Sequence, residues 1–269
     1  MSGAPPRELA HGKLRLDEPA PGVVRLVIAN PTKRNALDHP ILDAMTDALS
    51  RLDARCVIVT GSEGMFSAGY DIGEIPDETF TEQAERLVAH PFTAALEALE
   101  AYPYPTLAAL NGHTIGGGLE LALSCDLRVA AEGIRLGMPP AKLGLVYSHT
   151  GLRKFIDAIG APRTRELFLV GRNIDADQAL SWGLVNQVCD PDTLELAALE
   201  LATEIAANAP LSLRGNKRII RELLDARTEV NPELERELIE LRLASFASAD
   251  MREGVRAFAE KRPPRWEGA

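Results

Sequence analysis

Residues 111–126, NGHTIGGGLELALSCD, place three consecutive glycines just before Leu119 and Glu120, at the start of an apolar run. Inside a helix, glycine costs about 1 kcal/mol relative to alanine, so three in a row need a reason. A strand-like run, residues 106–110, precedes the stretch, and a buried helix is predicted over residues 119–124. The N-terminal amides of a helix lack internal partners and attract an anion, or an oxygen that becomes anionic. The glycines either admit such a ligand to the main chain or allow tight packing of the helix on the strand.

A second loop without bulky side chains lies upstream. Residues 56–60, CVIVT, are predicted to form a strand, and SEGMFSAGYDIGEIP follows at residues 62–76. Two loops that each follow a strand could direct two backbone N–H groups at one oxygen, as an oxyanion hole requires. Glu120 is then a candidate general acid or base beside the hole. The alternative is that Glu120 only complements the dipole of the helix that it begins.

Composition limits the classes of protein that the chain can represent. Its 269 residues are 46% hydrophobic and 25% charged, which predicts a globular protein with one sizeable domain or one domain with an appendage. A net charge of -10 makes nucleic acid an unfavourable partner. No apolar run reaches the roughly 18 residues that a membrane span needs, and the N-terminus lacks the apolar segment of a secretory signal. We therefore expect a cytoplasmic protein without membrane contact.

Motifs for metals and nucleotides do not occur in the sequence. The three cysteines form no CxxC pair and the five histidines no HExxH pattern, so no metal site is expected. The glycine stretch is not GxGxxG, because Leu121 stands at the position of the last glycine, and no Walker motif occurs.

Strands alternate with helices through roughly the first 190 residues. We expect strands over residues 23–28, 56–60, 106–110, 127–131, 134–138 and 185–188, a helix capped by Asp38, and a helix over residues 81–101. From Leu194 the pattern is helical only, with amphipathic segments over residues 194–208, 211–226, 232–248 and 251–261. This order predicts an α/β core followed by a helical appendage, which covers either its own core or a neighbouring subunit.

Four segments together resemble one known family. FSAGYDI, NGHTIGGGLELALSCDLRVAA, AKLGL and AFAEKRPPRW, in this order, are similar to the crotonase, or enoyl-CoA hydratase/isomerase, superfamily, from about Val23 to Trp266. The resemblance implies an α/β spiral of ββα units over residues 1–200 and a C-terminal helical region, residues 201–269, for trimerisation and closure of the active site. It also implies coenzyme A thioester substrates, no separate cofactor, and a homo-trimer or hexamer.

The resemblance also assigns roles to single residues. The oxyanion hole would be formed by the backbone amides of Tyr70 and Gly117, with Glu120 as the acid or base. The remaining residues would contact coenzyme A: Ala68, Tyr70 and Ile72 in the adenine-binding loop, Lys33 and Lys261 as positive charges, and Phe258 in the same groove.

Two departures from the hydratase pattern bear on the reaction. Hydratases of the family use a second glutamate in a PE-type step, and here Met138 and Pro139 are followed by Pro140 at its position. Tyr147 stands where hydratases carry a small residue or proline, and the surrounding segment is similar to that of methylmalonyl-CoA decarboxylases in the superfamily, which carry a histidine in place of Tyr70.

Proline cannot position a water, so the expected chemistry is isomerisation or decarboxylation through an enolate, with Tyr147 as a second catalytic group. The alternatives are hydration by Glu120 with a non-standard second group, and a non-catalytic CoA-binding subunit.

Overall fold

The computed structural model describes residues 5–71, 88–227 and 230–268. A large sheet has the strand order β1-β2-β3-β4-β6-β8-β11. β1 and β2 join it antiparallel, and the neighbours from β3 onward are parallel. Its strands are β1 (Arg7–Leu9), β2 (Leu14–Ala20), β3 (Val23–Ile28), β4 (Cys56–Gly61), β6 (Thr106–Leu110), β8 (Leu127–Ala131) and β11 (Gln187–Cys189).

A smaller sheet continues the large one. It has the order β10-β9-β7-β5 and contains β5 (Met65–Ser67), β7 (His113–Ile115), β9 (Arg135–Gly137) and β10 (Ile174–Asp175). β4 runs into β5, β6 into β7 and β8 into β9, so three central strands of the large sheet each extend into a strand of the small one. This repetition confirms the predicted spiral of ββα units.

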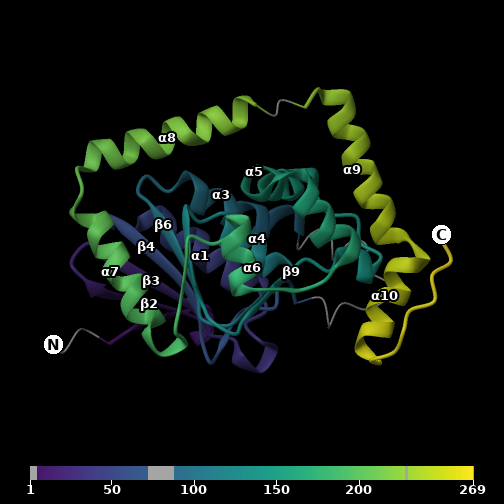
Figure 1. Cartoon of the computed structure of the whole chain (residues 1–269), viewed down its shortest axis with the longest axis horizontal. Coiled ribbons are helices and arrows are strands. Elements are labelled where there is room, and N and C mark those ends of the chain that lie inside the picture. The colour runs from purple at the N-terminus through teal and green to yellow at the C-terminus, as the bar shows by residue number, and fades with distance from the viewer. Residues whose placement is uncertain (1–4, 72–87, 228–229, 269) are drawn as a thin grey trace.

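Helices cover both faces of the large sheet (Figure 1). α7 (Leu194–Ala207) packs against β4, β6 and β8, whereas α1 (His39–Arg51) and α3 (Thr93–Ala101) pack against each other on the opposite side. The central strands β4 and β6 are almost wholly buried, as expected for parallel strands covered on both faces. The remaining core helices are α4 (Gly117–Leu123), α5 (His149–Arg165) and α6 (Ala176–Trp182).

Most of the predicted elements agree with the structure, and the exceptions have clear causes. Asp38 caps α1 by accepting a hydrogen bond from the Ile41 amide at 3.0 Å, as predicted. The short strands β5 and β7 occupy segments predicted as loops, because three residues are too few for a periodic signal. α4 begins at Gly117 rather than Leu119, and β11 lies two residues beyond the predicted start. The predicted helix 81–101 lies partly outside the described residues, and its described part contains Pro91 in a π-helical turn before α3.

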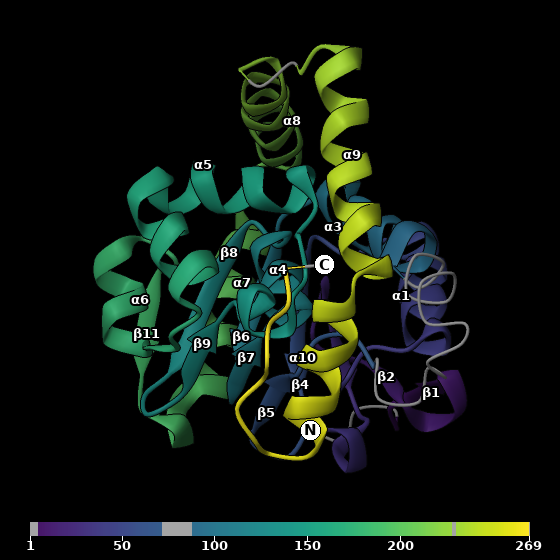
Figure 2. The same ribbon diagram turned by 90° about the vertical axis from the view of Figure 1, so that its right-hand side faces the viewer.

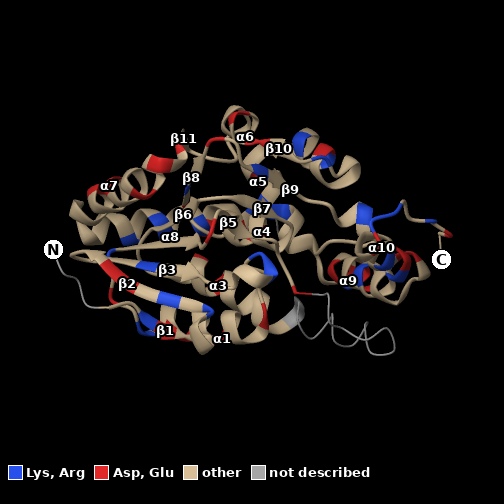
Figure 3. Cartoon of the chain, turned by 90° about the horizontal axis from the view of Figure 1, so that it is seen from below, with Lys and Arg blue, Asp and Glu red and all other residues tan. Residues whose placement is uncertain are grey.

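Three helices form the C-terminal region, α8 (Pro210–Ala226), α9 (Pro232–Ala247) and α10 (Ala249–Ala259). α8 has no buried residue and lies along the outside of the core, and α9 leads down from it to α10 (Figures 1 and 2). Phe246 and Met251 form a small hydrophobic cluster with Leu145 of the core. Acidic and basic residues are mixed along α9 and α10 (Figure 3). The proposed boundary at residue 200 falls inside α7, which packs on the large sheet.

No helix in the described part of the chain combines the length and the apolar character that a membrane crossing needs.

Candidate active site

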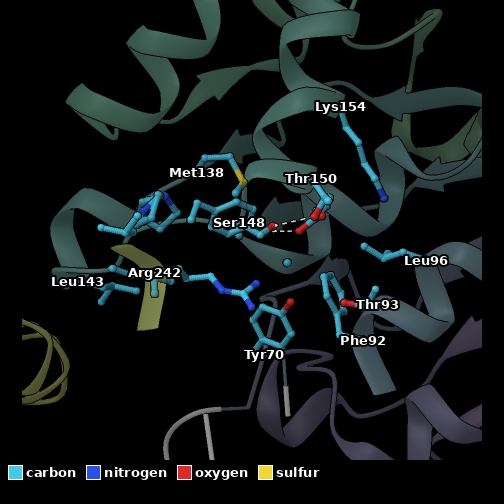
Figure 4. A pocket seen from close by; sticks show the side chains of 18 of the residues that line it. Tyr70, Phe92, Thr93, Leu96, Met138, Leu143, Ser148, Thr150, Lys154 and Arg242 are labelled. Atoms are coloured by element: carbon cyan, nitrogen blue, oxygen red, sulfur yellow. Dashed lines mark hydrogen bonds between the residues drawn. The ribbon is translucent and has the colours of Figure 1, made fainter. Parts of the chain in front are cut away.

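A cavity of about 230 Å³ lies where the small sheet, α3, α4 and the C-terminal helices meet. Tyr70 and Phe92 line one side of it, and residues 138–148 and α5 line another (Figure 4). Arg242 and Phe246 on α9 and Met251 on α10 close it from the C-terminal region. The cavity therefore joins the loops of the core to a region far away in the sequence.

The three glycines before Glu120 serve two different purposes. Gly116 has φ 57° and ψ -127°, a conformation that side chains disfavour. A Cβ on Gly118 would lie 2.6 Å from the carbonyl oxygen of Ser67, so this glycine is required for α4 to pack on β5. A Cβ on Gly117 would lie 3.1 Å from the Tyr70 ring, on the side of the cavity. Close packing and an open main chain therefore both account for the glycine run.

The two chain segments that carry the Tyr70 and Gly117 amides meet at this point. Leu37 and Tyr70 form a parallel bridge, in which the Leu37 amide donates to Gly69 and the Asp71 amide donates to Leu37. The Tyr70 N–H, between these two bonds, is directed away from Leu37. The Gly117 N–H is the first of α4 and has no partner within the helix. A Cβ on Gly69 would be only 2.9 Å from the Gly117 nitrogen, so the two chain segments are in contact.

Glu120 projects from the first turn of α4 into the cavity and is only 4% exposed. The Tyr147 hydroxyl donates a hydrogen bond to its Oε2, and Oε1 accepts no hydrogen bond from the described residues. Burial raises the pKa of Glu120, an effect that the nearby Lys154 ammonium and the Tyr147 hydrogen bond partly offset. A raised pKa makes the carboxylate a stronger proton acceptor, as a general base requires.

The position of Tyr147 is fixed by the packing of its ring and by the helix cap that follows it in the sequence. Its ring packs edge-on against Phe168, with 5.3 Å between centroids. The next residue, Ser148, caps α5 by accepting from the Gly151 amide at 3.0 Å. Burial raises the pKa of the Tyr147 phenol well above its ordinary value, so the group stays protonated and remains a hydrogen-bond donor.

Two basic residues of the cavity were not predicted from the sequence. Lys154 on α5 forms an ion pair with Glu100 on α3 at 2.5 Å and donates to the Ser124 hydroxyl at 2.8 Å. Arg242 on α9 extends toward Tyr70 (Figure 4). In the sequence each is a basic residue of an amphipathic helix, a pattern typical of solvent-facing positions, and no motif marks either of them.

Pro140 lines the cavity at the position where a second carboxylate is expected, and it starts a 3₁₀ turn, Pro140–Leu143. Two other carboxylates, Glu97 and Glu100, reach the cavity from α3. Glu100 is bound to Lys154, whereas Glu97 is exposed. A second acidic group is therefore present at the cavity, but on an element other than the predicted one.

The residues expected to contact coenzyme A fall into two groups. Ala68 and Tyr70 line the cavity. Lys33 lies 3.7 Å from Asp71 as an ion pair, Phe258 is 73% exposed on α10, and Lys261 follows α10 with φ 54°; these three do not line the cavity. Ile72 lies outside the described residues. Within the described segments, no group of three or more His, Cys, Asp or Glu side chains could hold a metal ion.

Comparisons with known proteins extend over nearly the whole chain. Residues 18–269 match the family described as Enoyl-CoA hydratase/isomerase. A putative enoyl-CoA hydratase from Thermus thermophilus is 37% identical over 259 residues, covering 91% of this chain and 98% of that protein. The 2,3-dehydroadipyl-CoA hydratase of Escherichia coli is 32% identical over 254 residues, covering 91% and 95%. A structure of methylmalonyl-CoA decarboxylase in complex with 2-nitronate-propionyl-CoA has a TM-score of 0.86 at 29% identity, covering 96% of this chain and 99% of that one.

Proposed function

The chain belongs to the enoyl-CoA hydratase/isomerase family, and we propose that it processes an acyl-CoA thioester through an enolate formed in the cavity beside Glu120. The thioester oxygen accepts hydrogen bonds from the Tyr70 and Gly117 amides. These donors are preorganised by the bridge to Leu37 and by the start of α4. Such donors stabilise the charge that develops on the oxygen, and losing one typically costs about 3–4 kcal/mol in the transition state.

Glu120 moves the proton in this scheme. Its Oε1 accepts no hydrogen bond from the described residues, while the Tyr147 hydroxyl donates to Oε2 and orients the carboxyl. In an isomerisation, Glu120 takes a proton from the carbon next to the thioester and returns it two carbons further along. One carboxyl group is sufficient for both steps, so Pro140 is no obstacle.

Decarboxylation uses the same oxyanion hole. The bond between the α-carbon and the carboxylate breaks, its electron pair becomes the enolate, and carbon dioxide leaves; a proton then adds to the α-carbon. The likeness to a methylmalonyl-CoA decarboxylase supports this version. We therefore keep isomerisation and decarboxylation as the two forms of the proposed activity, with coenzyme A carried by the substrate and no separate cofactor.

Hydration is the second candidate, and two observations favour it. Glu97 and Glu100 bring carboxylates to the cavity from α3, and several relatives are named hydratases. A water would then be held between Glu120 and one of these groups. Glu100 is less suited to this role, because its pairing with Lys154 at 2.5 Å already occupies it.

One panel of substrates separates the candidates. A single preparation is assayed for isomerisation of a 3-enoyl-CoA, decarboxylation of methylmalonyl-CoA and hydration of crotonyl-CoA. We expect isomerisation or decarboxylation to exceed hydration by about 10²–10⁴-fold, the usual contribution of one general acid or base. Hydration as the fastest reaction, sensitive to Glu97→Gln or Glu100→Gln, would replace the enolate proposal with the hydratase one. Binding of acyl-CoA without any turnover would favour a non-catalytic subunit.

A further inference from the structure

Arg242 brings into the cavity a positive charge that has no ion-pair partner among the described residues. It lies in the middle of α9, and its side chain reaches from the C-terminal region toward Tyr70 (Figure 4). Its Nε is fully buried and makes no hydrogen bond in the described part of the chain. A buried N–H without an acceptor typically costs about 1–3 kcal/mol, and more when the group is charged, so this arrangement needs an explanation.

The other cations of the cavity are already paired, which sets Arg242 apart. Lys154 is bound to Glu100 at 2.5 Å, and Arg153 lies 2.9 Å from Asp225. No described carboxylate is within ion-pair distance of Arg242. Its charge nevertheless acts inside the cavity. It lowers the pKa values of Glu120 and Tyr70, although burial raises both by more.

The guanidinium group suits one kind of ligand. Arginine stays charged at any ordinary pH and presents a planar set of donors that binds a carboxylate through two parallel hydrogen bonds. A buried N–H without an acceptor is unfavourable, and a ligand carboxylate would supply both a counter-charge and the missing acceptor for Nε.

We propose that Arg242 binds a carboxylate on the acyl group, so that the substrates are CoA monothioesters of dicarboxylic acids. This rests on the proposed function and narrows its substrate class. Arg242 lines the same cavity as Glu120 and Tyr147, where the acyl group reacts, which favours an acyl carboxylate over the phosphates of coenzyme A as the anion.

Pairing with Arg242 also indicates whether the bound carboxylate is lost in the reaction or remains on the product. An arginine that holds a carboxylate stabilises the charged ground state more than a transition state leading to neutral carbon dioxide. Arg242 therefore fits a carboxylate that remains on the product, and the inference favours isomerisation over loss of that same group.

Binding of unreactive thioethers tests the proposal. The affinities of 2-carboxyethyl-CoA, its uncharged analogue propyl-CoA and free coenzyme A are measured by calorimetry for the wild-type protein and for Arg242→Met, Arg242→Lys and Arg153→Met. We expect the wild type to bind the carboxylated thioether about 10- to 100-fold more tightly than propyl-CoA, which corresponds to about 1.4–2.8 kcal/mol.

Each variant then has a defined outcome. Arg242→Met should abolish the preference, Arg242→Lys should retain part of it, and Arg153→Met should leave it unchanged because Arg153 is already paired. If the wild type binds the two thioethers with equal affinity, that result alone overturns the inference. An equal loss for both thioethers and for free coenzyme A in Arg242→Met overturns it too, and assigns Arg242 to the phosphates. If free coenzyme A and both thioethers all fail to bind the wild type, the proposed function itself is wrong.

Discussion

The loops around α4 and the C-terminal helices contribute to one cavity, but they are built in opposite ways. Around α4, main chain lies against main chain: a Cβ on Gly112 would be 1.9 Å from the Gly64 oxygen, and one on Gly118 would be 2.6 Å from the Ser67 oxygen. On α8, a Cβ on Gly215 would meet nothing within 4 Å, and the helix has no buried residue.

This difference in packing suggests that the loops around α4 and the C-terminal helices have different roles. The proposed mechanism requires the amides of Tyr70 and Gly117 to be held in fixed positions, and the close packing of their loops is suited to that. The C-terminal helices instead contribute side chains such as Arg242 and Phe246 to the cavity, where we propose that the acyl group binds. We infer that the loops of the core carry the catalytic groups and that the C-terminal helices determine which substrate binds.

The largest effect is expected at Glu120. Glu120→Gln keeps the size of the side chain and its contact with Tyr147 but removes the proton acceptor, so turnover should fall by about 10²–10⁴-fold. Glu97→Gln, a change of the exposed carboxylate on α3, is the matched control and should stay within a few-fold of the wild type. Steady-state kinetics on the substrate found in the panel measure both. Equal losses in the two variants would contradict the role of Glu120.

Gly118→Ala tests the packing of the core. The added methyl group would enter the space between α4 and β5, where the nearest atom is the main-chain carbonyl oxygen of Ser67, which cannot move aside cheaply. Overpacking of this kind costs about 1–3 kcal/mol, which urea unfolding would detect. Unchanged stability would mean that α4 is less constrained than its contacts indicate.

The exposed apolar ridge of α8 tests the other region. Leu211, Ile219 and Leu223 lie at helical spacing and are 83%, 57% and 61% exposed. We expect them to be covered in a trimer or hexamer, so that light scattering gives three or six times the chain mass of 29.1 kDa. Ile219→Glu with Leu223→Glu should dissociate the assembly. A monomeric wild type would contradict the expectation.

A smaller effect concerns the stability of the core against pH. Burial raises the pKa of Glu120 in the folded state above its unfolded value of about 4.5. At a pH between the two pKa values, the folded protein keeps Glu120 protonated, whereas the unfolded chain has lost that proton. The free energy of unfolding therefore falls as pH rises through this range. Glu120→Gln removes this cost. We expect its Tm to exceed that of the wild type at about pH 8, by about 2–4 °C per kcal/mol recovered, and the gain to vanish below about pH 4. A gain that persists at low pH would have another cause.

The smallest effect is expected on α8. Gly215→Ala, made in the Ile219→Glu, Leu223→Glu background so that no second copy covers the helix, should stabilise the protein by up to about 1 kcal/mol in urea unfolding. Destabilisation would show that Gly215 has a close neighbour after all, and the contrast with Gly118 would disappear.

The two regions also differ in how far the sequence predicts them. The strands β3, β4, β6 and β8 and the cap at Asp38 follow from apolar runs and local capping chemistry, and the glycine stretch points to Glu120. β5 and β7 escaped prediction because three-residue strands are fixed by pairing with each other, a non-local property.

The sequence did not predict Arg242 as a cavity residue, for a related reason. Only the path of α9 over the core turns a basic residue of an amphipathic helix into part of the cavity. The contact between Tyr147 and Glu120, 27 residues apart, was likewise not visible in the sequence, although both residues were predicted to be catalytic.

Exchange of the α-protons of a saturated acyl-CoA for deuterium tests enolate formation most directly, because it requires no knowledge of the natural reaction. The substrate, a saturated CoA monothioester such as succinyl-CoA, is incubated in deuterium oxide and followed by proton NMR. The account predicts exchange of the protons next to the thioester by the wild type and a loss of about 10²-fold or more in Glu120→Gln. Tight binding of the thioester without exchange by the wild type, or equal exchange by Glu120→Gln, would contradict it.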